Sequence, residues 1–198
     1  MPALARREVD KVHIEVLRHA KAYSRKRWNG GSDRERPLDD AGEAQARRLV
    51  DELLADGGVA EIRTSPLVRC TQTVEPLAAA LGCAPVVDER LAELRTLPVH
   101  DRGSAWVASA WLGGRALAVV EELAAAPVDG RIVLCSHGDV IPALLATLAG
   151  RDDLALGDVR VRKGGRVTLE LAGGRVRRAT PVPPPRLEAF SPTAGHSA

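Results

Sequence analysis

The sequence contains few aromatic residues and few cysteines, and each shortage restricts what the chain can be. Phe, Trp and Tyr together make up 3% of the 198 residues, so Ala, Leu and Val must fill the core of a chain that is 45% apolar. The cysteines, Cys70, Cys83 and Cys135, are odd in number and widely spaced, which argues against a disulfide framework and a paired-cysteine metal site. We expect them to be buried as small apolar side chains.

The sequence also lacks a strong excess of charge and a long apolar segment. Charged residues make up 27% of the chain, but they nearly cancel to a formal net charge of +2, which gives no general reason to expect a nucleic-acid partner. No apolar run reaches the roughly 18 residues that a membrane helix needs. The first residues lack the charged-then-apolar order of a secretory signal. We therefore expect a cytoplasmic protein without nucleic-acid or membrane partners, whose oligomeric state these features do not determine.

Segments with the pattern of buried strands alternate with segments of helical periodicity. Strands are expected at 11–17, 60–64, 85–88 and 131–135, helices at 38–56, 65–81, 104–126 and 140–148, and a hairpin at 166–171 and 175–179. This alternation predicts an α/β fold, a three-layer α/β/α sandwich whose mostly parallel central sheet ends in a C-terminal hairpin. Residues 1–181 are expected to form this domain, and 182–198 a flexible, proline-rich tail.

Three local signals set the expected helix boundaries. Asp39 or Asp40 can cap the first helix. Ser65 is expected to be the N-cap of the second helix, with Pro66 as its first residue. The third helix could break near the glycine pair at 113–114.

Two of the five histidines follow buried strands directly. His19 comes after the first strand and His137 after the strand at 131–135. In an open α/β sheet, ligands bind beyond the carboxyl ends of the strands, so these two positions are candidate functional residues. His13 lies inside a strand, which favours a structural role, and His196 lies in the tail. His100 falls in an irregular segment and could border a pocket.

Basic residues accompany these histidines at the same predicted edge of the sheet. Arg18 precedes His19, and Arg69 lies in the first turn of a helix that also follows a strand. Two guanidinium groups can fork onto the oxygens of a phosphoryl group. The free N–H groups at nearby helix starts favour an anion as well. The pattern predicts a phosphate-binding site.

Four short motifs resemble those of the histidine phosphatase superfamily, the phosphoglycerate mutase-like fold. They are L-R-H-A at 17–20, S-P-L-V-R-C-T-Q-T at 65–73, L-A-E at 91–93 and S-H-G at 136–138. Their order along the chain matches that of the family, and together they are far more specific than a single R-H pair. The resemblance implies the α/β/α fold and a phosphatase that needs neither a metal ion nor a cofactor.

A finer resemblance is to short, SixA-like members and to the phosphatase-like domain that some actinobacterial MutT-type proteins carry behind a Nudix domain. It rests on segments 36–39, 42–46, 69–78, 140–142 and 162–164. The acidic helix of a Nudix domain is absent from this sequence, as are the long insertions of larger acid phosphatases. We expect a compact member of the family.

The resemblance also implies roles for individual residues. His19 is the expected nucleophile, and it would form a covalent phosphohistidine. Arg18, Arg69 and a protonated His137 would bind the phosphoryl oxygens, with His137 counted among the catalytic residues. Glu93 is the expected general acid, because it stands in the L-A-E motif; Glu89 is its rival.

The strongly basic loop that follows His19, residues 21–36, is a candidate substrate rim or a solvated surface loop. As a rim, Lys21 and Arg25 would bind the rest of an anionic substrate, and Tyr23 or Trp28 would stack on a base. The segment 162–165 could act similarly or simply turn the chain.

The expected substrate is a small phosphorylated metabolite. A nucleoside monophosphate such as AMP fits best, because of the basic and aromatic loop and the MutT-linked resemblance. The alternative is a SixA-like protein phosphohistidine phosphatase. An inactive binding domain is disfavoured because every catalytic residue type is present. A Ser-His-Asp hydrolase is disfavoured because the sequence has no G-x-S-x-G motif.

Overall fold

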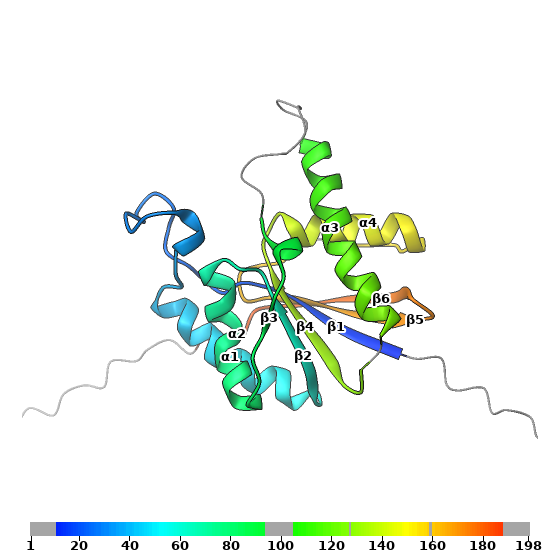
Figure 1. Cartoon of the computed structure of the whole chain (residues 1–198), viewed down its shortest axis with the longest axis horizontal. Coiled ribbons are helices and arrows are strands. Elements are labelled where there is room, and N and C mark those ends of the chain that lie inside the picture. Colours follow the sequence, from blue (N-terminus) through cyan, green and yellow to red (C-terminus); the bar gives the residue numbers. More distant parts are fainter. Residues whose placement is uncertain (1–10, 94–104, 127, 159, 188–198) are drawn as a thin grey trace, which may run out of the picture.

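A six-stranded sheet with strand order β3-β2-β4-β1-β5-β6 forms the centre of the molecule (Figure 1). The computed structural model describes residues 11–93, 105–126, 128–158 and 160–187. The strands are β1 (Lys11–Arg18), β2 (Val59–Thr64), β3 (Val86–Val87), β4 (Arg131–Ser136), β5 (Arg166–Ala172) and β6 (Arg175–Val182). The helices are α1 (Asp40–Ala55), α2 (Val68–Leu81), α3 (Ala105–Ala125) and α4 (Val140–Asp152), with 3₁₀ turns η1 (Asp33–Glu35) and η2 (Glu89–Leu91).

The sheet is parallel from β3 to β1 and antiparallel from β1 to β6. Helices α1 and α2 cover one face, and α3 and α4 cover the other (Figure 1). Strand β4 is buried on both faces, since Ile132 and Leu134 pack toward α3 and α4 while Val133 and Cys135 pack toward α1 and α2. The predicted fold class, a three-layer sandwich with a C-terminal hairpin, is confirmed.

The expected start of the second helix is wrong by two residues. Helix α2 begins at Val68, and its N-cap, Leu67, makes no side-chain capping bond. The backbone of Ser65 stays in the sheet because its N–H donates to the carbonyl of Cys135 at 3.0 Å. The first helix follows the prediction, with Asp39 accepting a capping bond from the N–H of Gly42.

The glycine pair in the third helix does not break it. Helix α3 runs continuously through Gly113 and Gly114. A Cβ on Gly113 would lie 2.7 Å from the carbonyl oxygen of Ala143 on α4. The missing side chain therefore allows α3 to pack closely on α4.

One cysteine departs from the expected burial. Cys70 and Cys135 are fully buried, but Cys83 is exposed. It follows Gly82, which ends α2 in the left-handed conformation with a φ of 65°, so Cys83 lies beyond the apolar face of the helix.

Some predictions concern residues that the structure does not describe. His100, His196 and residues 188–198 of the expected tail lie outside the described residues. Within the described part, no helix combines the length and the apolar character needed to cross a bilayer.

Candidate active site

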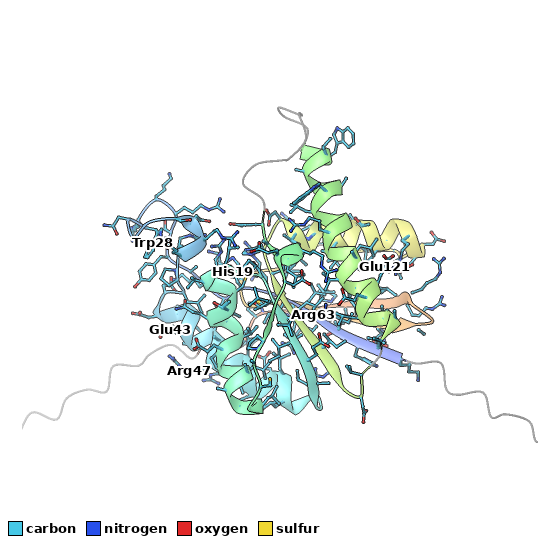
Figure 2. The ribbon with its side chains drawn as sticks, in the orientation of Figure 1. His19, Trp28, Glu43, Arg47, Arg63 and Glu121 are labelled. Carbon is cyan, nitrogen blue, oxygen red and sulfur yellow. The ribbon has the colours of Figure 1, made fainter. Side chains whose placement is uncertain are left out.

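The two strand-end histidines lie side by side at the carboxyl edge of the sheet. Arg18, the last residue of β1, pairs in register with Ser136 of the neighbouring β4, and the N–H of His19 donates to the carbonyl of Ser136 at 3.0 Å. The ring centroids of His19 and His137 are 5.4 Å apart, with an angle of 59° between the planes. Figure 2 shows His19 where the strands end. The parallel pairing of β1 and β4 thus brings together residues 118 positions apart.

The ring of His19 is held by the backbone of the next residue, Ala20. Its Nδ1 lies 2.7 Å from the carbonyl oxygen of Ala20 and donates its proton there, which leaves the lone pair on Nε2. The pKa of His19 is lowered to about 3, mainly by burial; the bond to Ala20 opposes this shift, and the nearby charges of Arg69, Arg18 and Lys163 add to it. His19 is therefore a neutral imidazole near pH 7, with Nε2 as its nucleophilic atom.

His137 is fully buried, and one of its ring nitrogens has a partner. Nε2 lies 2.8 Å from the hydroxyl oxygen of Ser65. Nδ1 has no hydrogen-bond partner within the described part of the chain and lies 3.6 Å from Oε2 of Glu93. Burial and the neighbouring His19 and Arg69 lower the pKa of His137 to about 2. The expected protonated ring is thus neutral here, because it is surrounded mainly by cations and has lost its hydration.

Arg18 reaches across the edge of β4 toward the loop that precedes α4. One terminal nitrogen donates to the carbonyl of Val161 at 2.7 Å. The guanidinium lies against Gly138, where an added Cβ would stand 2.5 Å from Cζ of Arg18. The glycine of the S-H-G motif therefore has a steric function, since it leaves room for the guanidinium group.

Arg69 is fully buried and is oriented by η1. Its terminal nitrogens donate to the carbonyl oxygen of Asp33 at 2.8 Å and contact the carboxylate of Asp33 at 3.4 Å. One of them also donates to Oε1 of Glu93. Arg36 binds the same Asp33 carboxylate at 2.7 Å. Arg25 lies 3.3 Å from the same carboxylate, so Asp33 binds three arginines of the site.

Glu93, and not Glu89, lies in the site. Its side chain is 11% exposed, whereas that of Glu89 is 63% exposed and pairs with Arg34 on the surface. Ser136 on β4 anchors the Glu93 segment by donating to the carbonyl of Leu91 at 2.7 Å. Burial raises the pKa of Glu93 above its ordinary value, although Arg69 opposes the shift.

A cavity of about 380 Å³ opens over His19. It is lined by Arg18, His19, Tyr23, Ser24, Arg25, Arg36, Glu93, Gly138, Asp139 and Lys163. Two of the four predicted rim residues are among them, Tyr23 and Arg25, and Arg25 also pairs with Glu93 at 2.8 Å.

The other two predicted rim residues lie outside the cavity lining. Lys21 pairs with Asp39 at 3.2 Å, at the start of α1. Trp28 packs near Tyr23, with ring centroids 6.4 Å apart, and donates to the carbonyl of Ser32 (Figure 2). Both side chains thus support the loop rather than face the cavity.

Sequence reasoning gave no individual role to Asp33 or Arg36, although both lie in the candidate rim loop 21–36, and it left the role of Lys163 open within the segment 162–165. The structure places all three charged residues at the site. A signal for Asp33 was present, because S-D-R-E at 32–35 has capping-box spacing, and the structure shows both bonds of that box between Ser32 and Glu35. Asp139 caps α4, since its carboxylate accepts from the N–H of Val140 at 2.9 Å.

Comparison with known proteins agrees with this arrangement. The model of the histidine phosphatase superfamily (branch 1) matches residues 14–105 and 106–180. The 8-oxo-(d)GTP phosphatase of Mycolicibacterium smegmatis is 34% identical over 180 residues, which are 91% of this chain and 51% of that protein. The chain thus spans about half the length of this relative.

Two solved structures share the fold. The mycobacterial glucosyl-3-phosphoglycerate phosphatase superposes with a TM-score of 0.62 at 21% identity, over 88% of this chain and 99% of that one. The protein histidine phosphatase SixA, complexed with tungstate, superposes with a TM-score of 0.55 at 19% identity, over 86% and 97%. The match to the family model and the 34% identical relative show that the chain belongs to the histidine phosphatase superfamily, as its motifs predicted, and the prediction of a phosphatase is confirmed at the level of the family.

Proposed function

We propose that the protein is a metal-independent phosphomonoester hydrolase that works through a covalent phosphohistidine at His19. The observation that carries this proposal is the state of His19: a neutral ring whose Nδ1 proton is held by Ala20, so that Nε2 is free to attack beside Arg18 and Arg69. Phosphoryl transfer needs mainly positioning and charge neutralisation, and guanidinium groups supply both.

In the first step, Nε2 of His19 attacks phosphorus and the bond from phosphorus to the ester oxygen breaks. Arg18 and Arg69 bind the non-bridging oxygens, and His137 donates a hydrogen bond from its Nδ1–H to one of them. Glu93 gives its proton to the leaving oxygen, so that an alcohol departs. The raised pKa of Glu93 favours the protonated carboxyl that this step needs.

In the second step, a water molecule attacks phosphorus and the bond from phosphorus to Nε2 breaks. Glu93, now a carboxylate, takes a proton from the water, which restores the acid form. Inorganic phosphate then leaves, and His19 is again neutral. The buried position of Glu93, 3.6 Å from His137, supports the use of one group for both proton transfers.

A small phosphorylated metabolite is the proposed substrate, and a nucleoside monophosphate such as AMP is the specific choice. Tyr23 in the cavity wall is 44% exposed and offers its ring to a base. The relative from Mycolicibacterium smegmatis is named for action on a nucleotide, which supports the same class. A SixA-like action on protein phosphohistidine is the alternative.

A panel assay tests the proposal. Phosphate release is measured from AMP, other nucleotides, sugar phosphates and a phosphohistidine protein, in buffer with a chelator. We expect AMP to be hydrolysed by the wild type, and activity to be absent from His19→Ala. His13→Gln, which removes an imidazole from within β1, serves as the matched control.

The possible outcomes of the panel distinguish the nucleophile, the metal independence and the substrate class. Wild-type rates in His19→Ala would overturn the nucleophile, and loss of activity in the chelator would overturn metal independence. Preference for the phosphoprotein would favour the SixA-like alternative. Binding of AMP without turnover of any substrate would indicate an inactive binding domain.

A further inference from the structure

The turn at residues 162–165 is bonded to the backbone of the proposed nucleophile. The N–H of Gly164 lies 3.1 Å from the carbonyl of Arg18 and 3.2 Å from that of His19, and the N–H of Arg18 donates to the carbonyl of Gly165 at 2.9 Å. Gly164 has a φ of 76°, which a residue with a side chain adopts only with strain. The turn therefore has a fixed position relative to His19.

Lys163 projects from this turn into the wall of the active-site cavity. Its carbonyl accepts from the side chain of Gln45 at 3.4 Å, which holds the base of the residue. Among the residues that the structure describes, its ammonium group makes no ion pair with a carboxylate. Asp39, the acidic group that acts on it, pairs with Lys21 at 3.2 Å.

The surroundings of Lys163 are mostly cationic. Burial lowers the pKa of its ammonium group, and the charges of Arg18 and Arg36 lower it further. Lys163 in turn contributes to the low pKa of His19, which shows that its charge acts at the nucleophile. A half-buried cation beside two others is stabilised when an anion binds among them.

We propose that Lys163 binds the transferred phosphoryl group beside Arg18, as a further cationic member of the phosphate site. This inference rests on the proposed function, because it assumes that the phosphoryl group is bound over His19. The ammonium group neutralises a non-bridging oxygen, and the hydrogen-bonded turn keeps it in place without a partner carboxylate. Lys163 is thus a catalytic residue that none of the four family motifs contains.

Three variants test the role: Lys163→Ala, Lys163→Met and Lys163→Arg. The dissociation constant of inorganic phosphate is measured by calorimetry, together with kcat and KM for the best substrate of the panel. Loss of a charged hydrogen bond predicts phosphate binding about tenfold to a hundredfold weaker in Lys163→Ala and Lys163→Met, and smaller losses in Lys163→Arg. The matched control is Arg160→Ala, which removes a cation that is 87% exposed and pairs with Asp158.

The pH profile separates binding from a merely structural role. The charged groups that face Lys163 are Arg18 on β1, Arg36 after η1, and Asp39 and Lys21 before α1. Because the pKa of Lys163 is lowered, its ammonium group loses its proton at a pH below the ordinary lysine range, and we expect phosphate affinity to fall there. Lys163→Arg should retain affinity to higher pH.

Unchanged phosphate binding in Lys163→Ala, with His19→Ala inactive, would overturn the inference and leave the proposed function intact. Full activity of His19→Ala would instead overturn the proposed function. Circular dichroism checks the folding of each variant. If Lys163→Ala is unfolded, Lys163→Met decides, and unchanged phosphate binding in it would overturn the inference equally.

Discussion

The hydroxyl oxygen of Ser65 lies 2.8 Å from Nε2 of His137, and both residues are fully buried. The same oxygen accepts from the N–H of Leu67 at 3.4 Å. The thiol sulfur of Cys70 lies 3.4 Å from the same nitrogen, so two groups that can donate, a hydroxyl and a thiol, face Nε2. We infer that Nε2 accepts from them and that the ring proton resides on Nδ1, which lies 3.6 Å from Oε2 of Glu93. Ser65 thereby makes His137 a hydrogen-bond donor toward the cavity without a positive charge.

Substitution of Ser65 tests this relationship. In Ser65→Ala the ring can place its proton on Nε2, and Nδ1 then presents a lone pair to the phosphoryl oxygens. Loss of a neutral hydrogen bond of about 1 kcal/mol corresponds to a decrease of roughly fivefold in kcat/KM. Ser65→Thr keeps the hydroxyl and should lose less. Nitrogen NMR of labelled histidine reads the tautomer, and an unchanged tautomer in Ser65→Ala would contradict this role.

Substitution of Glu93 should alter the pH profile in a defined direction. The acid form is needed for proton donation, so activity on esters with poor leaving groups falls as pH rises through the raised pKa of Glu93. Glu93→Gln should lose this limb and about 10²- to 10⁴-fold in kcat. An aryl phosphate with a good leaving group should be affected much less. Glu89→Gln is the comparison, and a larger loss there would reverse the assignment.

The glycine of the S-H-G motif should be irreplaceable for a steric reason. A Cβ in Gly138→Ala would stand 2.5 Å from Cζ of Arg18, so the guanidinium must move. A displacement of about 1 Å in such a group can cost a hundredfold in kcat/KM. Gly114→Ala in α3 is the control, because nothing lies within 4 Å of the added Cβ. Equal kinetics in the two variants would refute the explanation.

The two active-site histidines should make the fold sensitive to acid. Their pKa values in the folded protein are about 3 and about 2, below the ordinary value near 6.5 in an unfolded chain. The unfolded state therefore binds more protons below about pH 6.5, and the free energy of unfolding falls as pH decreases through that range. Glu93, whose pKa is raised, offsets part of this loss. Urea unfolding at pH 7 and pH 5 should show a smaller decrease for His19→Gln than for the wild type, and an equal decrease would contradict the prediction.

A buried ionic cluster beneath α1 should stabilise the sheet. Glu15 on β1 is 2% exposed and pairs with Arg131 at 3.0 Å and Arg166 at 3.2 Å. Glu15→Gln removes this carboxylate from two largely buried guanidinium groups, although Arg166 keeps Glu52 at 2.7 Å. Loss of these charged hydrogen bonds is expected to cost about 1.5–3 kcal/mol in the free energy of unfolding. Glu170→Gln, which removes an exposed carboxylate 4.0 Å from Arg178, should change it by less than about 0.5 kcal/mol. Denaturant titrations of both variants measure the difference.

The sequence predicted that one edge of the sheet holds Arg18, His19 and His137. Buried apolar runs identify parallel strands, and such strands end at the same edge. The L-A-E motif favoured Glu93 over Glu89, but the sequence left Glu89 as a rival. Both belong to one short segment, and their ion pairs decide between them: Glu93 binds Arg69 in the site, and Glu89 binds Arg34 on the surface.

The capping signal at Ser65 and Pro66 failed for a related reason. Ser65 has the residue type of an N-cap, but its backbone pairs with β4 and its hydroxyl binds His137. The preference of serine for an N-cap position is worth about 1 kcal/mol. It is overridden when distant residues bind the same backbone N–H and hydroxyl groups.

The sequence by itself determined the order of the strands and helices, the family, and the residue types of the phosphate site, because these depend on periodicity and on motifs within short segments. Only the tertiary structure decided that Asp33, Arg36 and Lys163 lie at that site, since they come from loops whose course depends on distant hydrogen bonds. It also decided that His19 is a neutral imidazole with its lone pair on Nε2, because burial and neighbouring charges set a pKa and neither can be read from a linear chain.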